Sequence, residues 1–390
     1  MSDSEEVDYS LANPDTLTKY KLAGEISAKV LDKVKAACVD GANVMEISIL
    51  GDKLIEEETA KVYKGKKGIA KGIAFPTAVS PNHIATHLSP LPSEPEAELT
   101  LKDGDVVKIS LGAHIDGFAG ILAETITVGS AAEITGPIAD AINAAWYASE
   151  AAIRLVKPGN KNWDVSDAVL SIAESYGTKP LEDMLSHQQT RNVIDGTKRI
   201  ILNPSEGKKK GVDTATFEEG EVYGIDILIT TGEGKVKKSE SRTTIYKKTD
   251  NTYSLKLKAS RTIYSDIQKR FGPFPFTTRA LEDEKKARMG IQECTQHALL
   301  IPYEVYEDKK GEIVVQFFTT IAVTKNGIIK IAGPATPDLS KFKTEKKITD
   351  ENLLKVIASS LKPSSKKKNK KKSKAAANGG EEASAVEDAE

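Results

Sequence analysis

Apolar residues recur at helical spacing in two separate regions of the chain. The segment 18–38 has apolar residues every three or four positions, and a short Gly-Ala-Asn connection leads to a second such segment at about 44–63. The segment 138–156 repeats the pattern, stops at Lys-Pro-Gly, and is followed by a further helical segment over 162–176. This spacing is typical of amphipathic helices, and Pro and Gly mark their ends. The chain is therefore predicted to contain two helical hairpins.

A strand of similar sequence follows each predicted hairpin. The two segments read L-K-D-G-D-V-V-K-I-S-L at 101–111 and F-E-E-G-E-V-Y-G-I-D-I at 217–227, and they align at a constant offset of 116 residues. Because side chains alternate between the faces of a strand, the aligned Ser110 and Asp226 are expected on the same face of the sheet. A duplicated unit of helices and strands predicts an α+β fold whose halves pack about a pseudo-twofold axis, with a site between them.

Composition excludes several classes of protein. The chain has 390 residues, of which 39% are hydrophobic and 28% charged, and no run reaches the roughly 18 apolar residues that a membrane span needs. The N-terminus is acidic and polar, unlike a signal peptide. Cys38 and Cys294 lie far apart and neither belongs to a C-x-x-C pair, so neither a disulfide framework nor a structural zinc site is expected. We expect a globular protein of a reducing compartment, with no membrane partner.

Charge is balanced over the whole chain but uneven along it. There are 55 Lys and Arg against 56 Asp and Glu, so no net field would attract a polyanion. Basic residues nevertheless concentrate at 235–261 and in the C-terminal tail. Each group alone is typical of a solvated surface, but several together favour an anionic partner, because every phosphate contact releases counterions. The candidate nucleic-acid contacts are Lys235, Lys237, Lys238, Arg242, Lys247, Lys248, Lys256, Lys258, Lys366, Lys367, Lys368, Lys370, Lys371 and Lys372.

The tail 362–390 has a composition of its own. It contains eight lysines followed by five acids and almost no apolar side chain. Ordering such a segment costs backbone entropy that no burial repays. We predict that it is disordered, and its lysine clusters are also typical of nuclear localisation signals.

Five separated motifs resemble one known family. They are A-F-P-T-A-V-S-P-N-H-I-A-T-H-L-S-P at 74–90, V-V-K-I-S-L-G-A-H-I-D-G-F at 106–118, M-L-S-H-Q at 184–188, E-E-G-E-V-Y-G-I-D-I-L-I-T-T-G-E-G at 218–234 and Q-F-F-T-T-I at 316–321. In this order they resemble the type II methionine aminopeptidases of peptidase family M24. The resemblance is stronger to their non-peptidase branch, the ErbB3-binding or proliferation-associated proteins, and within it to the fungal curved-DNA-binding proteins.

The resemblance implies a domain organisation. It predicts a pita-bread fold over 17–345, with a small helical insertion of the type II aminopeptidase kind at about 266–301. An acidic extension, 1–16, precedes this domain, and a helical extension, 346–361, follows it. We expect the insertion to have its own core, formed by Phe271, Phe274, Phe276, Leu281, Met289 and Ile291.

The resemblance also implies a metal site that has lost most of its ligands. Family peptidases hold two divalent metals with two aspartates, one histidine and two glutamates, and the matching positions here are Ser110, Ile121, His187, Asp226 and Phe318. Three of the five ligands are absent, since Ile and Phe offer no lone pair and a neutral hydroxyl binds a hard dication poorly. His87 matches a substrate-side histidine, and Asp195 stands where a second would be. We therefore expect no metal, no cofactor and no catalytic residue, with His87 and His187 kept as hydrogen-bonded relics.

Two functions follow from the loss of this chemistry. The first is a non-enzymatic nucleic-acid-binding protein that recognises DNA by shape and backbone charge, with the preference for curved duplex that the resemblance implies. The alternative is a scaffold that binds structured ribosomal RNA, and with it the large ribosomal subunit, and regulates translation or growth. An active aminopeptidase is the third and least favoured function. The expected locations are the nucleus or nucleolus and the cytoplasm.

Overall fold

The computed structural model describes residues 7–129 and 133–362. The six candidate lysines at 366–372 and the predicted disordered tail beyond Lys362 lie outside these residues, as does the start of the acidic extension. Within the described residues, no helix is long and apolar enough to cross a membrane.

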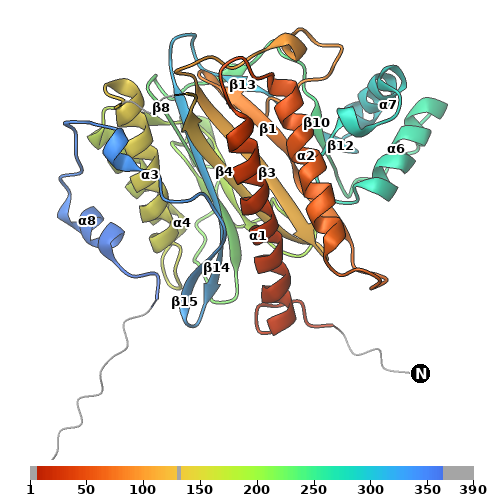
Figure 1. Ribbon diagram of the computed structural model, residues 1–390. Coiled ribbons are helices and arrows are strands. Elements are labelled where there is room, and N and C mark those ends of the chain that lie inside the picture. The colour runs from red at the N-terminus through yellow and green to blue at the C-terminus, as the bar shows by residue number, and fades with distance from the viewer. Residues whose placement is uncertain (1–6, 130–132, 363–390) are drawn as a thin grey trace, which may run out of the picture.

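A nine-stranded sheet forms the centre of the molecule (Figure 1). Its strands run in the order β1-β3-β4-β14-β8-β6-β7, with β15 beside β14 and β5 beside β8, and its pairings are antiparallel. The strands are β1 (Lys71–Pro81), β3 (Val106–Ile115), β4 (Phe118–Thr127), β5 (Lys179–Pro180), β6 (Leu185–Gln189), β7 (Arg199–Ile201), β8 (Val222–Thr230), β14 (Val314–Thr324) and β15 (Gly327–Ala332).

The two predicted helical hairpins cover this sheet (Figure 1). Helices α1 (Pro14–Ala37) and α2 (Val44–Lys61) pack on β1, β3 and β4, whereas α3 (Pro137–Leu155) and α4 (Asn162–Ser175) pack on the part of the sheet that contains β8. Helix α1 begins before the predicted Thr18 because Pro14 fits the first helical turn and the Asn13 side chain accepts the N–H of Asp15.

Alternation along the strands separates two faces of the sheet. Ile109 of β3 belongs to the apolar core beneath α1 and α2, and Ile225 of β8 belongs to the core beneath α3 and α4. Their neighbours Ser110 and Asp226 turn to the opposite face and line a cavity there. The predicted period of two is therefore confirmed in both strands.

Backbone hydrogen bonds repeat between the two halves. The N–H of Gly41 donates to the carbonyl of Leu101 over 2.8 Å, and the N–H of Gly159 donates to the carbonyl of Phe217 over 3.1 Å. Each bond joins a helix–helix turn to the segment before a strand. The isolated β-bridges Asn43–Thr100 and Lys161–Thr216 are related in the same way. This correspondence supports the duplication inferred from the two aligned segments.

The insertion combines a small sheet with two helices. Strands β11 (Phe276–Thr277), β10 (Ile245–Lys248) and β12 (Leu300–Tyr303) pair in that order, and helices α6 (Lys258–Arg270) and α7 (Glu284–Gln296) pack together at one side of the molecule (Figure 1). Helix α6 begins before the expected boundary at about 266.

Two residues assigned to the core of the insertion lie elsewhere. Phe276, Leu281 and Ile291 are buried in it, as predicted. Met289 is 60% exposed, because the buried positions of α7 form a stripe that its position does not share. Phe274 packs instead against the central sheet and stacks on His114 with ring centroids 4.2 Å apart. The prediction was wrong for these two residues.

The remaining elements complete the periphery. Helix α8 (Glu351–Ala358) lies in the predicted C-terminal extension and packs on α3. A third sheet has the order β2-β13-β9. The other elements are β2 (Ile84–Thr86), β9 (Lys237–Lys238), β13 (Tyr306–Glu307), α5 (Glu206–Lys209), and the 3-10 helices η1 (Pro95–Glu98), η2 (Thr278–Ala280) and η3 (Leu339–Lys341).

Candidate functional site

A row of directly paired residues crosses the sheet on the face away from the helices. Ser110 of β3 pairs with Ala123 of β4, Ala123 pairs with Phe318 of β14, and Phe318 pairs with Asp226 of β8. Directly paired residues point to the same face, so the row presents one hydroxyl, one methyl group, one aromatic ring and one carboxyl group. Ile121, two residues before Ala123, shares this face.

These side chains line a cavity of about 170 Å³ between the two halves. The structure brings together all five positions that the resemblance matched to metal ligands, together with His87 and Asp195. Thr86, Gln189 and Gln316 also contribute polar groups to the lining, and none of them was among the residues predicted from the sequence. Gln189 lies on β6 and Gln316 on β14, the strands on either side of β8. The complete lining consists of Phe75, Thr86, His87, Ser110, Ile121, Met184, Leu185, His187, Gln189, Ile194, Asp195, Asp226, Tyr303, Gln316 and Phe318.

Aromatic and aliphatic side chains form much of the cavity wall. Phe75 and Tyr303 meet edge to face with centroids 5.3 Å apart, and Tyr303 meets the ring of His87 in the same way at 5.3 Å. Ile121 and Phe318 pack with Phe75 in one apolar cluster. Two of the positions that the resemblance assigns to lost ligands are therefore part of an ordinary packed core.

His187 is held as a neutral imidazole. Its Nδ1 lies 3.1 Å from the carbonyl oxygen of Gly196, which can only accept, so Nδ1 carries the proton and donates. Burial lowers the pKa of His187, against the opposing effect of this hydrogen bond. The imidazole therefore has one nitrogen, Nε2, left as an acceptor.

His87 is also held as a neutral ring. It adopts a left-handed backbone conformation with φ of 65°, and its Nδ1 lies 3.0 Å from the carbonyl oxygen of Glu304. Burial lowers the pKa of His87 to about 4. The side chain is therefore uncharged at neutral pH and is fixed by a backbone carbonyl, as expected of a structural histidine.

Asp226 is partly buried, and no residue in the described part of the chain forms an ion pair with it. Gln316 Nε2 donates to its Oδ1 over 2.8 Å, and the Asp226 backbone N–H donates to Ser186 Oγ over 2.8 Å. Burial raises the pKa of Asp226 to about 7, although the hydrogen bond from Gln316 lowers it. The carboxyl group is thus divided between its protonated and ionised forms near neutral pH.

The donors in this cavity do not fit a pair of divalent cations. Across residues 7–129 and 133–362, no three His, Cys, Asp or Glu side chains come together in a way that could hold a metal ion. The Asp226 carboxyl group accepts a hydrogen bond from the Gln316 amide, and the His187 imidazole donates one to the Gly196 carbonyl. Each side chain therefore already has a partner of its own. A hard dication needs several anionic oxygens. Two carboxyl groups line this cavity: Asp195 is paired with Lys247, and Asp226 has its pKa raised to about 7.

Lys247 occupies the wall of this region rather than an open surface. Its Nζ lies 2.6 Å from both carboxylate oxygens of Asp195, and its side chain is 13% exposed. Lys247 is one of the nucleic-acid contacts predicted from the sequence. The ion pair directs its charge toward Asp195, which leaves it poorly placed for an external phosphate.

The other candidates from the basic segment fall into two groups. Lys237, Lys238 and Arg242 form ion pairs with Glu307, Glu304 and Glu94 at 3.2, 2.6 and 2.5 Å, respectively. The cationic side chains of these pairs are exposed whereas their carboxylates are largely covered, and the pairs reduce the local positive charge. The remaining four form no ion pair with a described residue, and they are Lys235, Lys248, Lys256 and Lys258.

A sheet built from two similar halves, with helices on one face and a cavity on the other, defines the pita-bread class of protein. The chain belongs to metallopeptidase family M24, whose model matches residues 18–248. The predicted fold class is confirmed. Family membership and the relatives described next also confirm the resemblance to the proliferation-associated branch.

Curated relatives match most of the chain. A protein of Schizosaccharomyces pombe named "Curved DNA-binding protein" is 56% identical over 91% of this chain and 93% of its own length. ERBB-3 binding protein 1 of Solanum tuberosum is 43% identical over 88% of each chain. A methionine aminopeptidase of Methanothermobacter thermautotrophicus is 27% identical over 80% of this chain. The relatives of higher identity are thus named for binding or proliferation, not for peptidase activity.

Solved structures give the same arrangement. The structure of a thermophilic Arx1 is 41% identical, covers 90% of this chain and all of its own, and superposes with a TM-score of 0.85. A methionine aminopeptidase of Thermotoga maritima has a TM-score of 0.55 at 20% identity, which shows the shared fold alone.

Proposed function

We propose that this chain is a non-enzymatic nucleic-acid-binding protein, built on a peptidase fold whose metal site has been converted to packed core. The observation that carries the proposal is the row Ser110, Ala123, Phe318 and Asp226, with Ile121 beside it. The family resemblance assigns metal ligands to four of these five positions, and here they offer a single carboxyl group. Apolar residues at such positions relieve the repulsion that clustered carboxylates would suffer without metal.

We further propose that the protein binds DNA through backbone charge and shape, and prefers curved duplex. The similarity to a relative named for binding curved DNA supports this choice. Lysine contacts to phosphate carry no sequence information, so selectivity has to come from the shape of the duplex. Bending a site of two to three turns costs about 1 to 6 kcal/mol, and an intrinsically curved fragment avoids part of that cost.

Competition between curved and straight DNA tests this proposal. The two duplexes have equal length and base composition, and differ in whether their A-tracts are phased with the helical repeat. We expect tighter binding of the curved fragment at every salt concentration, with both affinities falling steeply as salt rises. Equal affinity for the two fragments would contradict recognition of curvature, and no measurable binding of either would contradict the function itself.

The alternative proposal is a scaffold associated with ribosomal RNA. Lysines that contact DNA phosphates would also suit folded RNA, which is recognised through its backbone and shape. The similarity to ERBB-3 binding protein 1 and to proliferation-associated protein A supports a role in growth. Co-sedimentation with large ribosomal subunits, together with weak binding to free DNA, would favour this alternative. Either role is consistent with the proposed location in nucleus and cytoplasm.

A further inference from the structure

A groove of about 490 Å³ lies at the end of the molecule where the described chain stops. The turn after α3 provides Lys157 to one wall, and the hairpin between β14 and β15 provides Lys325. The last described residues run alongside, because the N–H of Ile328 donates to the carbonyl of Leu361 over 2.9 Å. Figure 1 shows the end of the described chain next to β15.

The groove has a positive edge. Lys157, Lys325 and Lys362 all line it, all are exposed, and none forms an ion pair with a residue in the described part of the chain. Arg154 adds no free charge, since its Nη1 lies 2.6 Å from Glu150 Oε2. Glu219 is an acid in the lining, so three free lysines face one carboxylate.

This arrangement contrasts with the basic segment at 235–258. There, four of the eight candidate residues already bind carboxylates of the protein. An incoming phosphate would have to displace those carboxylates, whereas Lys157 and Lys325 are ready to donate without any exchange. Lysine serves phosphate as a mobile point charge, which suits contacts to a backbone of variable sequence.

The sequence that follows Lys362 contains more lysines. Lys366 follows Lys362 by four residues, and the cluster continues to Lys374. An extended chain spans at most about 3.6 Å per residue, so four residues of chain are a short link. A polyanion held by these lysines is therefore within reach of the groove, and the two sets of contacts reinforce each other.

We propose that this groove binds the phosphate backbone of a nucleic acid through Lys157, Lys325 and Lys362. The inference rests on the proposed function and names the folded surface that performs it. The ligand is the sugar–phosphate backbone of a nucleic acid, which the lysines recognise by its charge and not by its base sequence.

A paired charge substitution in the full chain tests the groove. The variant Lys157→Gln with Lys325→Gln removes two exposed positive charges, and the control Lys102→Gln with Lys285→Gln removes two exposed lysines that do not line the groove. The readout is the slope of log affinity against log salt for a DNA duplex, measured by fluorescence anisotropy. We expect the slope to fall by about 1 for each groove lysine removed and to stay unchanged in the control.

The possible outcomes distinguish failure of the groove proposal from failure of the proposed function. If the wild-type chain binds duplex and the groove variant keeps the wild-type slope, the groove is overturned while the proposed function stands. If both double variants lose the same slope, general charge explains the binding and the groove is again overturned. If the wild-type chain binds no nucleic acid, the proposed function itself fails. Circular dichroism of both variants confirms that each is folded.

Discussion

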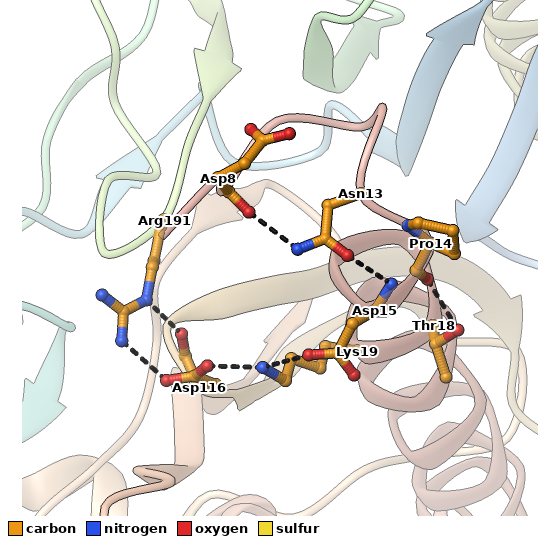
Figure 2. A network of polar contacts seen from close by, with 8 residues as sticks. All are labelled: Asp8, Asn13, Pro14, Asp15, Thr18, Lys19, Asp116 and Arg191. Atoms are coloured by element: carbon orange, nitrogen blue, oxygen red, sulfur yellow. Dashed lines mark hydrogen bonds and ion pairs between the residues drawn. The ribbon is translucent and has the colours of Figure 1, made fainter. Parts of the chain in front are cut away.

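Asp116 and Arg191 join the two halves of the central sheet. Asp116 lies in the turn between β3 and β4, and Arg191 follows β6. Arg191 Nη2 donates to Asp116 Oδ1 over 2.7 Å and its Nε donates to the Asp116 carbonyl over 2.9 Å (Figure 2). Lys19 of α1 binds the other carboxylate oxygen over 2.7 Å. Both oxygens of a mostly buried carboxylate are thus satisfied by two different elements.

Replacing this carboxylate should loosen the contact between the halves. We expect Asp116→Asn to lower the free energy of unfolding by about 1 to 2 kcal/mol, because the asparagine side chain has a single acceptor oxygen and can keep only one of the hydrogen bonds from Lys19 and Arg191. The loss is moderated because Asp15 lies 2.6 Å from Lys19 and remains its partner, and because Arg191 is 31% exposed. Urea unfolding measures the change.

A matched control is available on α1, the helix that carries Lys19. Asp32 pairs with Lys35 at 3.2 Å but is 73% exposed. We expect Asp32→Asn to change stability by less than about 0.5 kcal/mol. Equal effects of the two substitutions would contradict a special role for Asp116.

Asp226 should make stability depend on pH. Its pKa is raised to about 7 in the folded state by burial, against 3.8 as the ordinary value. Between these two values the folded state binds the proton and the unfolded state does not, so this group stabilises the fold below about pH 4 and loses that contribution as pH rises toward 7. Asp226→Asn should therefore raise stability at pH 8 relative to the wild type.

The measured quantity is the difference in the free energy of unfolding between the wild type and Asp226→Asn at each pH. His87 and His114, each with its pKa lowered to about 4 by burial, oppose the effect of Asp226 as pH rises. Subtracting the variant from the wild type at each pH removes their contribution. A difference that is constant from pH 4.5 to 8 would show that Asp226 is not a buried acid of raised pKa.

Two glycines set the distance between α1 and the sheet. A Cβ on Gly24 would overlap the carbonyl oxygen of Ile331, and a Cβ on Gly120 would lie 2.6 Å from the Gly24 nitrogen. We expect Gly24→Ala to destabilise the fold by about 1 to 3 kcal/mol, even though alanine favours the helix by about 1 kcal/mol. Thermal unfolding measures the change.

Gly207 provides the control for this substitution. It has no heavy atom within 4 Å of an added Cβ. Gly207→Ala should leave stability unchanged or slightly raised. A neutral Gly24→Ala would mean that α1 can move away from β15 at little cost.

Removing residues 362–390 should weaken nucleic-acid binding broadly and lower its salt dependence. The segment carries eight lysines, and each phosphate contact that is lost reduces the salt slope by about 1. A shorter deletion of 381–390 removes only acids among its charged residues and should not weaken binding. A salt slope unchanged by the longer deletion would show that the lysines take no part.

Much of the architecture could be predicted from local patterns. The helical hairpins follow from apolar spacing, and the shared face of Ser110 and Asp226 follows from the period of two along the aligned strands. These features depend on residues close in sequence, or on a repeat that the sequence displays directly.

Contacts between distant segments could not be predicted in the same way. Lys247 lies in a basic run, yet its charge is directed to Asp195, 52 residues earlier. Phe274 belongs to an aromatic run in the insertion, yet it stacks on His114 of β3. Composition predicts a charged or apolar surface, but the fold decides which of these side chains stay free to bind a partner.

The central claim is that the cavity between Ser110 and Asp226 no longer holds metals. Its most direct test is the metal content of the purified full chain, measured by mass spectrometry after equilibration with cobalt or manganese and removal of the free ions. We expect far less than one ion per chain and no metal-dependent release of N-terminal methionine. Two tightly held ions per chain would contradict it.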